Sequence, residues 1–101
     1  MVRHKFNAKP CVADGKKFPS KLERSYYNSL KMRQASGDVL FFLRQVAFEI
    51  PGGKYVTDFA VFLANGEVEF VDTKGMDTAM SKLKRKAVEE IYPVTIKIVT
   101  R

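Results

Sequence analysis

The Asn-Gly pair at residues 65–66 constrains the fold of this chain more than any other feature. It separates Tyr55–Leu63 from Glu67–Lys74, two stretches rich in β-branched and aromatic residues. Asn-Gly between such stretches is a strong signal for a tight turn between antiparallel strands. A third stretch, Val39–Ile50, precedes them and ends at a Pro-Gly-Gly break. The sequence therefore predicts three consecutive strands, the last two joined as a hairpin.

A helix is expected before these strands. Ser20 and Glu23 have the S-x-x-E spacing of a capping box, which opens a helix, and Gly37 marks the helix end. Its apolar stripe consists of Leu22, Tyr26 and Leu30, with Tyr27 as an optional further member. Upstream, Cys11–Phe18 contains an Asp-Gly pair between short apolar flanks, which predicts a small hairpin or turn.

A second helix is expected after the strands. Asp77 is placed to cap it, and Pro93 ends it. The apolar stripe of this helix consists of Met80, Leu83, Ala87 and Ile91. Residues 94–100 then alternate as a last strand. The predicted order is α-β-β-β-α-β, an α/β fold with a central mixed sheet flanked by helices. A chain of 101 residues holds one such domain, here 1–101, with residues 1–10 as a flexible basic arm.

The length of the hairpin turn decides which side chains meet. A two-residue loop pairs Ala64 with Glu67 and sends Asp58 and Asp72 to opposite faces. A three-residue loop pairs Leu63 with Glu67 and sets Asp58 opposite Asp72, with Cβ atoms about 4.5–5.5 Å apart. We favour the three-residue loop, because it also gathers four apolar side chains on one core face: Phe62, Ala60, Val68 and Phe70.

Facing carboxylates repel each other unless a cation lies between them. Oxygen ligands select Mg²⁺ or Mn²⁺, and Lys74 lies one step along the strand from Asp72. This set of groups suits metal-assisted hydrolysis of a phosphodiester. Simpler interpretations stay open: Asp72 and Lys74 can form a strand-end ion pair, Asp58 can cap a loop, and Glu23 can serve only the capping box. The lysine cluster at 82–86 can be a solvated helix face.

The basic charge is concentrated at the start of the chain. Residues 1–33 carry nine Lys and Arg against two acids, so the whole formal excess of +7 lies there. Such a segment is typical of proteins that bind a polyanion, most often nucleic acid, although it can also be a solvated tail. One Cys excludes an internal disulfide framework, and one His leaves no histidine pair for a metal.

Asp58 followed by Asp72-Thr73-Lys74 resembles the D…(D/E)-x-K signature of the restriction-endonuclease-like PD-(D/E)XK nucleases. Glu23 resembles the additional acid on the first helix of many members, and the element order matches the core of that fold over nearly the whole chain. The segments FPSKLE, TDF and VDTKG look most like small phage-encoded nucleases similar to archaeal-type Holliday junction resolvases. Thr57 stands where Pro is usual, and Asp72 where Glu is more usual.

The resemblance implies a Mg²⁺-dependent endodeoxyribonuclease, with Mn²⁺ able to substitute, that leaves a 5′-phosphate and a 3′-hydroxyl. Asp58, Asp72 and the Thr73 carbonyl would bind metal, Glu23 would bind a second metal or its water shell, and Lys74 would position or activate water. These four side chains, Glu23, Asp58, Asp72 and Lys74, are the expected catalytic set. The expected DNA contacts are Arg3, Lys5, Lys9, Lys21, Lys82, Lys84 and Arg85.

The same resemblance implies a homodimer that cuts branched DNA, a Holliday junction resolvase in the cytoplasm of a host cell. We expect no membrane segment, because apolar runs such as Val39–Leu43 are far too short to span a bilayer. Three alternatives remain: a structure-nonselective DNA nuclease, a nuclease for RNA or damaged DNA, and a noncatalytic DNA-binding accessory protein. An RNA-binding sheet platform would need exposed aromatic residues, whereas we expect Phe41, Phe42 and Phe48 in the core.

Overall fold

The computed structural model describes residues 11–100, and these form a mixed α/β arrangement, as the sequence predicts. Residues 1–10 lie outside the described part, and with them the expected basic arm. The elements, in chain order, are β1 (Cys11–Ala13), β2 (Lys16–Phe18), α1 (Lys21–Ala35), β3 (Val39–Ile50), β4 (Gly53–Leu63), β5 (Val68–Thr73), α2 (Ala79–Ile91) and β6 (Ile96–Val99).

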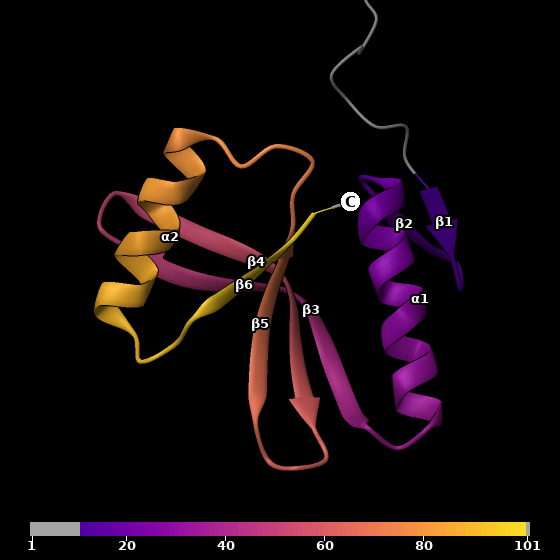
Figure 1. Cartoon of the computed structure of the whole chain (residues 1–101). Coiled ribbons are helices and arrows are strands. Elements are labelled where there is room, and N and C mark those ends of the chain that lie inside the picture. The colour runs from indigo at the N-terminus through magenta and orange to yellow at the C-terminus, as the bar shows by residue number, and fades with distance from the viewer. Residues whose placement is uncertain (1–10, 101) are drawn as a thin grey trace, which may run out of the picture.

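Strands β3 to β6 form one four-stranded sheet in the order β3-β4-β5-β6. The β3–β4 and β4–β5 pairs are antiparallel, whereas the β5–β6 pair is parallel. A parallel neighbour needs a crossover connection, and α2 supplies it. Helices α1 and α2 lie on opposite sides of the sheet, and the small β1–β2 hairpin packs beside α1 (Figure 1). The mixed sheet flanked by helices is therefore confirmed.

The turn between β4 and β5 has the three-residue form. The Leu63 amide donates to the Glu67 carbonyl at 2.9 Å, and Gly66 has a φ of 93°. That left-handed conformation favours glycine and gives the turn its bulge. Phe62 pairs with Val68, and the same register continues through the rest of the ladder toward Asp58 and Asp72.

Helix α1 begins as its sequence predicts. The Ser20 hydroxyl accepts the Glu23 amide at 3.0 Å, which is the expected cap. Leu30 and Tyr27 are buried on the side that faces the sheet. They pack with Phe59 and Val61 of β4 and with residues of the β1–β2 hairpin. This cluster, hereafter the α1 cluster, is the larger part of the core.

Helix α2 differs from its prediction in two respects. Thr78 is the N-cap, because its hydroxyl accepts the Ser81 amide, whereas Asp77 pairs with Arg85. The expected inward stripe is also wrong, since three of its members are exposed: Met80, Leu83 and Ile91. Val88 is the buried residue, next to Ala87, so the helix is rotated by about one position, or about 100°.

The rotation of α2 follows from the shape of the surface that it covers. Val88 is fully buried among Phe48, Tyr55 and Ile96, which form the second cluster of the core, the α2 cluster. Val88 is the buried residue of α2, and Tyr92, directly after the helix, packs on Phe48 beside it. The position of Val88 sets the orientation of the helix, while the wider apolar stripe remains on the surface.

The core face expected for the hairpin is only partly covered. Ala60 is buried and Phe70 packs on the α2 cluster, but Val68 is 42% exposed. Phe41, also expected in the core, is 45% exposed and stacks on Phe62 with ring centroids 4.3 Å apart. The reason is that α2 covers only the part of this sheet face that lies near Phe70, so the remainder of the face has no helix over it.

Strand β3 contributes to both clusters with side chains at even-numbered positions, which would lie on one face of a regular strand. Phe42 packs on the α1 cluster, whereas Val46 and Phe48 belong to the α2 side of the molecule. Side chains two residues apart normally share one face of a strand. Gln45, with a φ of 56°, lies at the point where the facing changes. The acidic side chains of Glu23, Asp58 and Asp72 lie close to this part of β3.

Candidate carboxylate site

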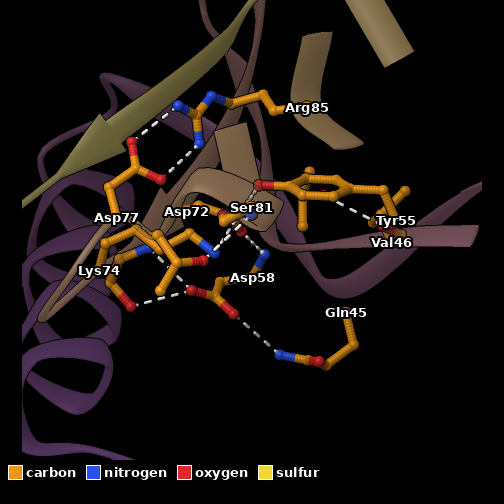
Figure 2. Close-up of polar contacts among 12 residues, drawn as sticks. Gln45, Val46, Tyr55, Asp58, Asp72, Lys74, Asp77, Ser81 and Arg85 are labelled. Carbon is orange, nitrogen blue, oxygen red and sulfur yellow. Dashed lines mark hydrogen bonds and ion pairs between the residues drawn. The ribbon is translucent and has the colours of Figure 1, made fainter. Parts of the chain in front are cut away.

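Asp58 of β4 and Asp72 of β5 are joined by reciprocal hydrogen bonds. The Asp58 amide donates to Asp72 Oδ1 at 2.8 Å. The Thr73 amide and hydroxyl donate to Asp58 Oδ2 at 2.8 and 2.9 Å. Each carboxylate is thus held by the strand that carries the other, as Figure 2 shows. The three-residue turn provides this register, and the expected meeting of the two acids is observed.

Tyr55 closes the inner side of the pair. Its hydroxyl donates to Asp72 Oδ2, and its ring lies beneath the Lys74 ammonium, which is 5.7 Å from the ring centroid. Asp72 is only 2% exposed, so these donors replace most of its hydration. Lys74 Nζ lies 3.6 Å from Asp72 Oδ2. The expected ion pair between Asp72 and Lys74 therefore exists, as one contact within a larger cluster.

Glu23 reaches this cluster from α1. Its backbone amide serves the helix cap, while its carboxylate, 3% exposed, turns toward the sheet. The Gln45 amide nitrogen lies 3.3 Å from Glu23 Oε2 and 3.5 Å from Asp58 Oδ1. Arg44 Nη2 lies 3.7 Å from the same Glu23 oxygen. The capping role and a site role thus use different atoms of the same residue.

The crowding of acids shows in their protonation. Burial, and after it the charge of the neighbouring Asp58, raise the pKa of Glu23 to about 7 against the opposing effect of Arg44. Burial also raises the pKa of Asp72, while the hydrogen bonds from Tyr55 and from the Asp58 amide act in the opposite direction. Burial and the Asp72 carboxylate raise the pKa of the Tyr55 hydroxyl, which therefore stays protonated as a donor. The raised pKa values of Glu23 and Asp72 mean that the nearby cations do not fully offset the burial and mutual repulsion of these carboxylates.

The donor set fits a hard divalent cation by its chemistry. Carboxylate oxygens and a backbone carbonyl are the ligands that Mg²⁺ and Mn²⁺ prefer. Asp58 Oδ1 accepts from Gln45 at a long 3.5 Å, and the Asp58 carboxylate also interacts with that of Glu23, so the Asp58 and Glu23 oxygens lie together. Among residues 11–100, no three His, Cys, Asp or Glu side chains are already arranged as ligands. The oxygen donors are gathered at one place, with the Glu23 carboxylate already beside that of Asp58.

The expected DNA-contact residues are dispersed. Lys21 is exposed as the first residue of α1, and Lys82 and Lys84 are exposed on α2. Arg85 instead forms two hydrogen bonds to Asp77, at 3.0 and 2.7 Å (Figure 2). Those contacts raise the pKa of Arg85 and lower that of Asp77. The other expected contacts lie outside the described residues: Arg3, Lys5 and Lys9.

Sequence reasoning missed two members of the site. Tyr55 looks like an ordinary strand residue, and only the fold brings its hydroxyl to Asp72. Gln45 did leave a signal, because Arg44 and Gln45 are polar neighbours within an otherwise apolar strand segment. With β3 and β4 in register, Gln45 lies opposite Asp58. A polar residue facing a predicted site acid across a hairpin is the pattern that could have identified it.

The fold and the site define a small α/β protein in which carboxylates and a lysine cluster where α1 meets strands β4 and β5. The chain belongs to the family described as "Protein of unknown function (DUF1064)", whose model matches residues 3–101. No curated protein and no solved structure matches the chain. In the part of the chain that the structure describes, neither helix is long and apolar enough to cross a membrane.

Proposed function

We propose that this protein is a metal-dependent endodeoxyribonuclease built on a restriction-endonuclease-like core. One observation supports the proposal above others: Asp58 and Asp72 meet across the β4–β5 hairpin, with Lys74 and Glu23 beside them. These groups come from separate elements and share one polar cluster. The element order and the parallel β5–β6 pair agree with the fold that this signature implies. A strand-end ion pair alone would not require Glu23 from α1.

The chain's own residues have distinct tasks in this proposal. Asp58, Asp72 and the Thr73 carbonyl would hold Mg²⁺ or Mn²⁺, and Glu23 would hold a second ion or its water shell. A bound cation would supply Lewis-acid activation of the phosphodiester and stabilise negative charge. Tyr55 keeps Asp72 oriented through its hydroxyl, and the ring beneath Lys74 confines the ammonium to one side of the site.

Lys74 completes the site as the group that would position or activate the attacking water. It lies just after β5, 3.6 Å from Asp72 Oδ2, which is close enough for attraction and too long for a strong hydrogen bond. Its ammonium protons remain free to orient a water molecule or to stabilise a phosphate oxygen. Since Lys74 is half-buried, the ammonium can contact substrate without leaving the cluster.

DNA is the substrate that the charge distribution favours, and branched DNA is our specific proposal. Exposed lysines on both helices, Lys21 on α1 and Lys82 and Lys84 on α2, would contact phosphates on two sides of the sheet. Such contacts give affinity without sequence reading, so selectivity would come from the shape of the DNA. Action as a homodimer would place two sites in fixed relation and allow paired cuts in a junction.

The test is cleavage of a labelled four-way junction, linear duplex and single strand, with Mg²⁺ or with chelator. We expect Mg²⁺-dependent cuts that are abolished by Asp58→Asn and by Lys74→Ala. Matched controls are Glu67→Gln and Lys97→Ala, which change an exposed acid and an exposed lysine outside the cluster. The variants must show wild-type folding by circular dichroism. Paired cuts in the junction alone support a resolvase, whereas cuts in every duplex support a nonselective nuclease.

Binding without cleavage in any metal, unchanged by these substitutions, would contradict the enzyme proposal and favour a noncatalytic DNA-binding protein. RNA and lesion-containing duplexes belong in the same panel, because the cluster itself carries nothing that selects an undamaged deoxyribose backbone. Faster cleavage of either substrate would move the assignment to that class while keeping the site residues.

A further inference from the structure

Gln45 has an unusual backbone for its position. It lies within the 12-residue strand β3 and has a φ of 56°, in the left-handed region that non-glycine residues rarely occupy. Its side chain is exposed, so its own burial does not maintain this conformation. Strained residues of this kind persist where the surrounding structure enforces them, often at functional sites.

The side chain of Gln45 lies where the acids of two elements converge. Its amide nitrogen is 3.3 Å from Glu23 Oε2 and 3.5 Å from Asp58 Oδ1. Glu23 belongs to α1 and Asp58 to β4, so one neutral donor group bridges a helix and a strand. Because the amide carries no net charge, it brings the carboxylates together without cancelling the charge that would attract a cation.

A purely structural explanation does not require this residue type. The side on which β3 packs changes near Gln45, but β4 makes the same change between Tyr55 and Phe59 without a residue of positive φ, so the change does not itself require the left-handed conformation. Glycine adopts that conformation without strain. The backbone conformation alone therefore favours glycine, and the amide is what glutamine adds at this position.

We propose that Gln45 is a positioning residue of the carboxylate site, which holds Glu23 beside Asp58 through its side-chain amide. This inference rests on the proposed function, because it assigns Gln45 a role toward the same cation-binding groups. Without the amide, Glu23 would keep the Arg44 guanidinium, 3.7 Å from Oε2, but would lose the donor that it shares with Asp58. Residues that orient ligands in this way usually contribute about 10–100-fold to metal affinity.

The decisive variant is Gln45→Gly, because it removes the amide while relieving the strained backbone. The control is Gln34→Ala, which removes another exposed glutamine whose amide donates to a backbone carbonyl, that of Leu40, at 3.2 Å. Mn²⁺ affinity is measured by titration calorimetry, and the stability of each metal-free protein by urea unfolding. We expect Gln45→Gly to be at least as stable as the wild type and to bind Mn²⁺ at least tenfold more weakly, with Gln34→Ala unchanged in affinity.

The outcomes separate this inference from the proposed function. Equal Mn²⁺ affinity of the wild type and a stable Gln45→Gly would overturn the role of Gln45 alone. Absence of Mn²⁺ binding by the wild type would overturn the proposed function, and this inference with it.

A second measurement tests the contact in the metal-free protein. The side-chain amide cross-peak of Gln45 in a ¹⁵N–¹H NMR spectrum can be assigned by its disappearance in Gln45→Gly. We expect this cross-peak to move in Glu23→Gln and in Asp58→Asn, and to stay in place in Glu67→Gln. A cross-peak that ignores both site substitutions would show that the amide does not hold the carboxylates, and the inference would be wrong.

Discussion

Helix α1 packs on the sheet through buried Tyr27 and Leu30, whereas α2 buries Val88 and leaves Met80 and Leu83 exposed. The α1 side also includes the β1–β2 hairpin, whose Phe18 ring lies 4.9 Å from that of Tyr27. The α2 side instead relies on the Asp77–Arg85 ion pair at the start of its helix. Glu23, the acid that a helix contributes to the carboxylate site, therefore comes from α1, the helix with the broader hydrophobic packing.

This difference has a functional logic under our proposal. A buried carboxylate that is costly to ionise needs a firmly held helix to keep it beside other acids. Glu23 occupies the first turn of α1, two turns or less from the buried Tyr27 and Leu30. Helix α2 contributes exposed lysines, which do not require such precise placement to contact a polyanion.

The largest expected change in stability comes from a substitution in the α1 cluster. Phe59 is fully buried in the α1 cluster and contacts the rings of Tyr26 and Phe42. We expect Phe59→Ala to lower the free energy of unfolding by about 3–5 kcal/mol, since it removes a large apolar group and leaves a cavity. Urea denaturation followed by circular dichroism measures this. A loss below about 1 kcal/mol would mean that the α1 cluster is not the main core.

The second prediction concerns the acid that α1 carries. The pKa of Glu23 is raised from 4.5 to about 7, so the folded state favours its protonated form. Stability from this group is complete below about pH 4.5 and is lost as the pH rises through 7, because the folded protein then ionises a buried acid. The full loss is about 3 kcal/mol at 1.36 kcal/mol per pKa unit.

The measurement is the free energy of unfolding of the metal-free protein between pH 4 and pH 8. Glu23→Gln is expected to remove most of the decline across this range, because glutamine has the same shape and does not titrate. Glu67→Gln, at an exposed position, serves as the control. A wild-type profile that rises with pH would contradict the assignment of a raised pKa to Glu23.

The smallest effects sharpen the comparison within α2. Val88 is fully buried, so Val88→Ala is expected to cost about 1–3 kcal/mol. Leu83 is 64% exposed, and Leu83→Ser should change stability by no more than about 0.5 kcal/mol. Both values come from thermal or urea unfolding. A larger loss of stability at Leu83 than at Val88 would mean that the stripe predicted from the sequence, and not Val88, faces the sheet in solution.

Much of the fold could be predicted because its signals are local. The Asn-Gly turn, the Ser20 cap and the alternating strands depend on neighbours within a few residues, and all three appear in the structure. The three-residue turn is also sufficient to predict that Asp58 and Asp72 meet, as they do in the structure. Periodicity and turn chemistry are sufficient for such features.

The errors arose where distant elements compete. Asp77 is a good capping residue, but its carboxylate accepts two hydrogen bonds from Arg85, and Thr78 caps α2. The hydrophobic stripe of α2 has the correct period and the wrong orientation, because the sheet accepts only Val88. Tyr55 and Gln45 were missed as site residues because their partners lie on other elements.

The sequence by itself determined the order of helices and strands, the turn that pairs the hairpin, and the identity of the acids and the lysine. These follow from backbone preferences and alternation, which act between residues close in the chain. Only the tertiary structure decided that Glu23 turns from its helix cap to the sheet and that Gln45 bridges it to Asp58. Those contacts join residues that are 22 and 13 positions apart, and only packing of the helix on the twisted hairpin brings such groups together.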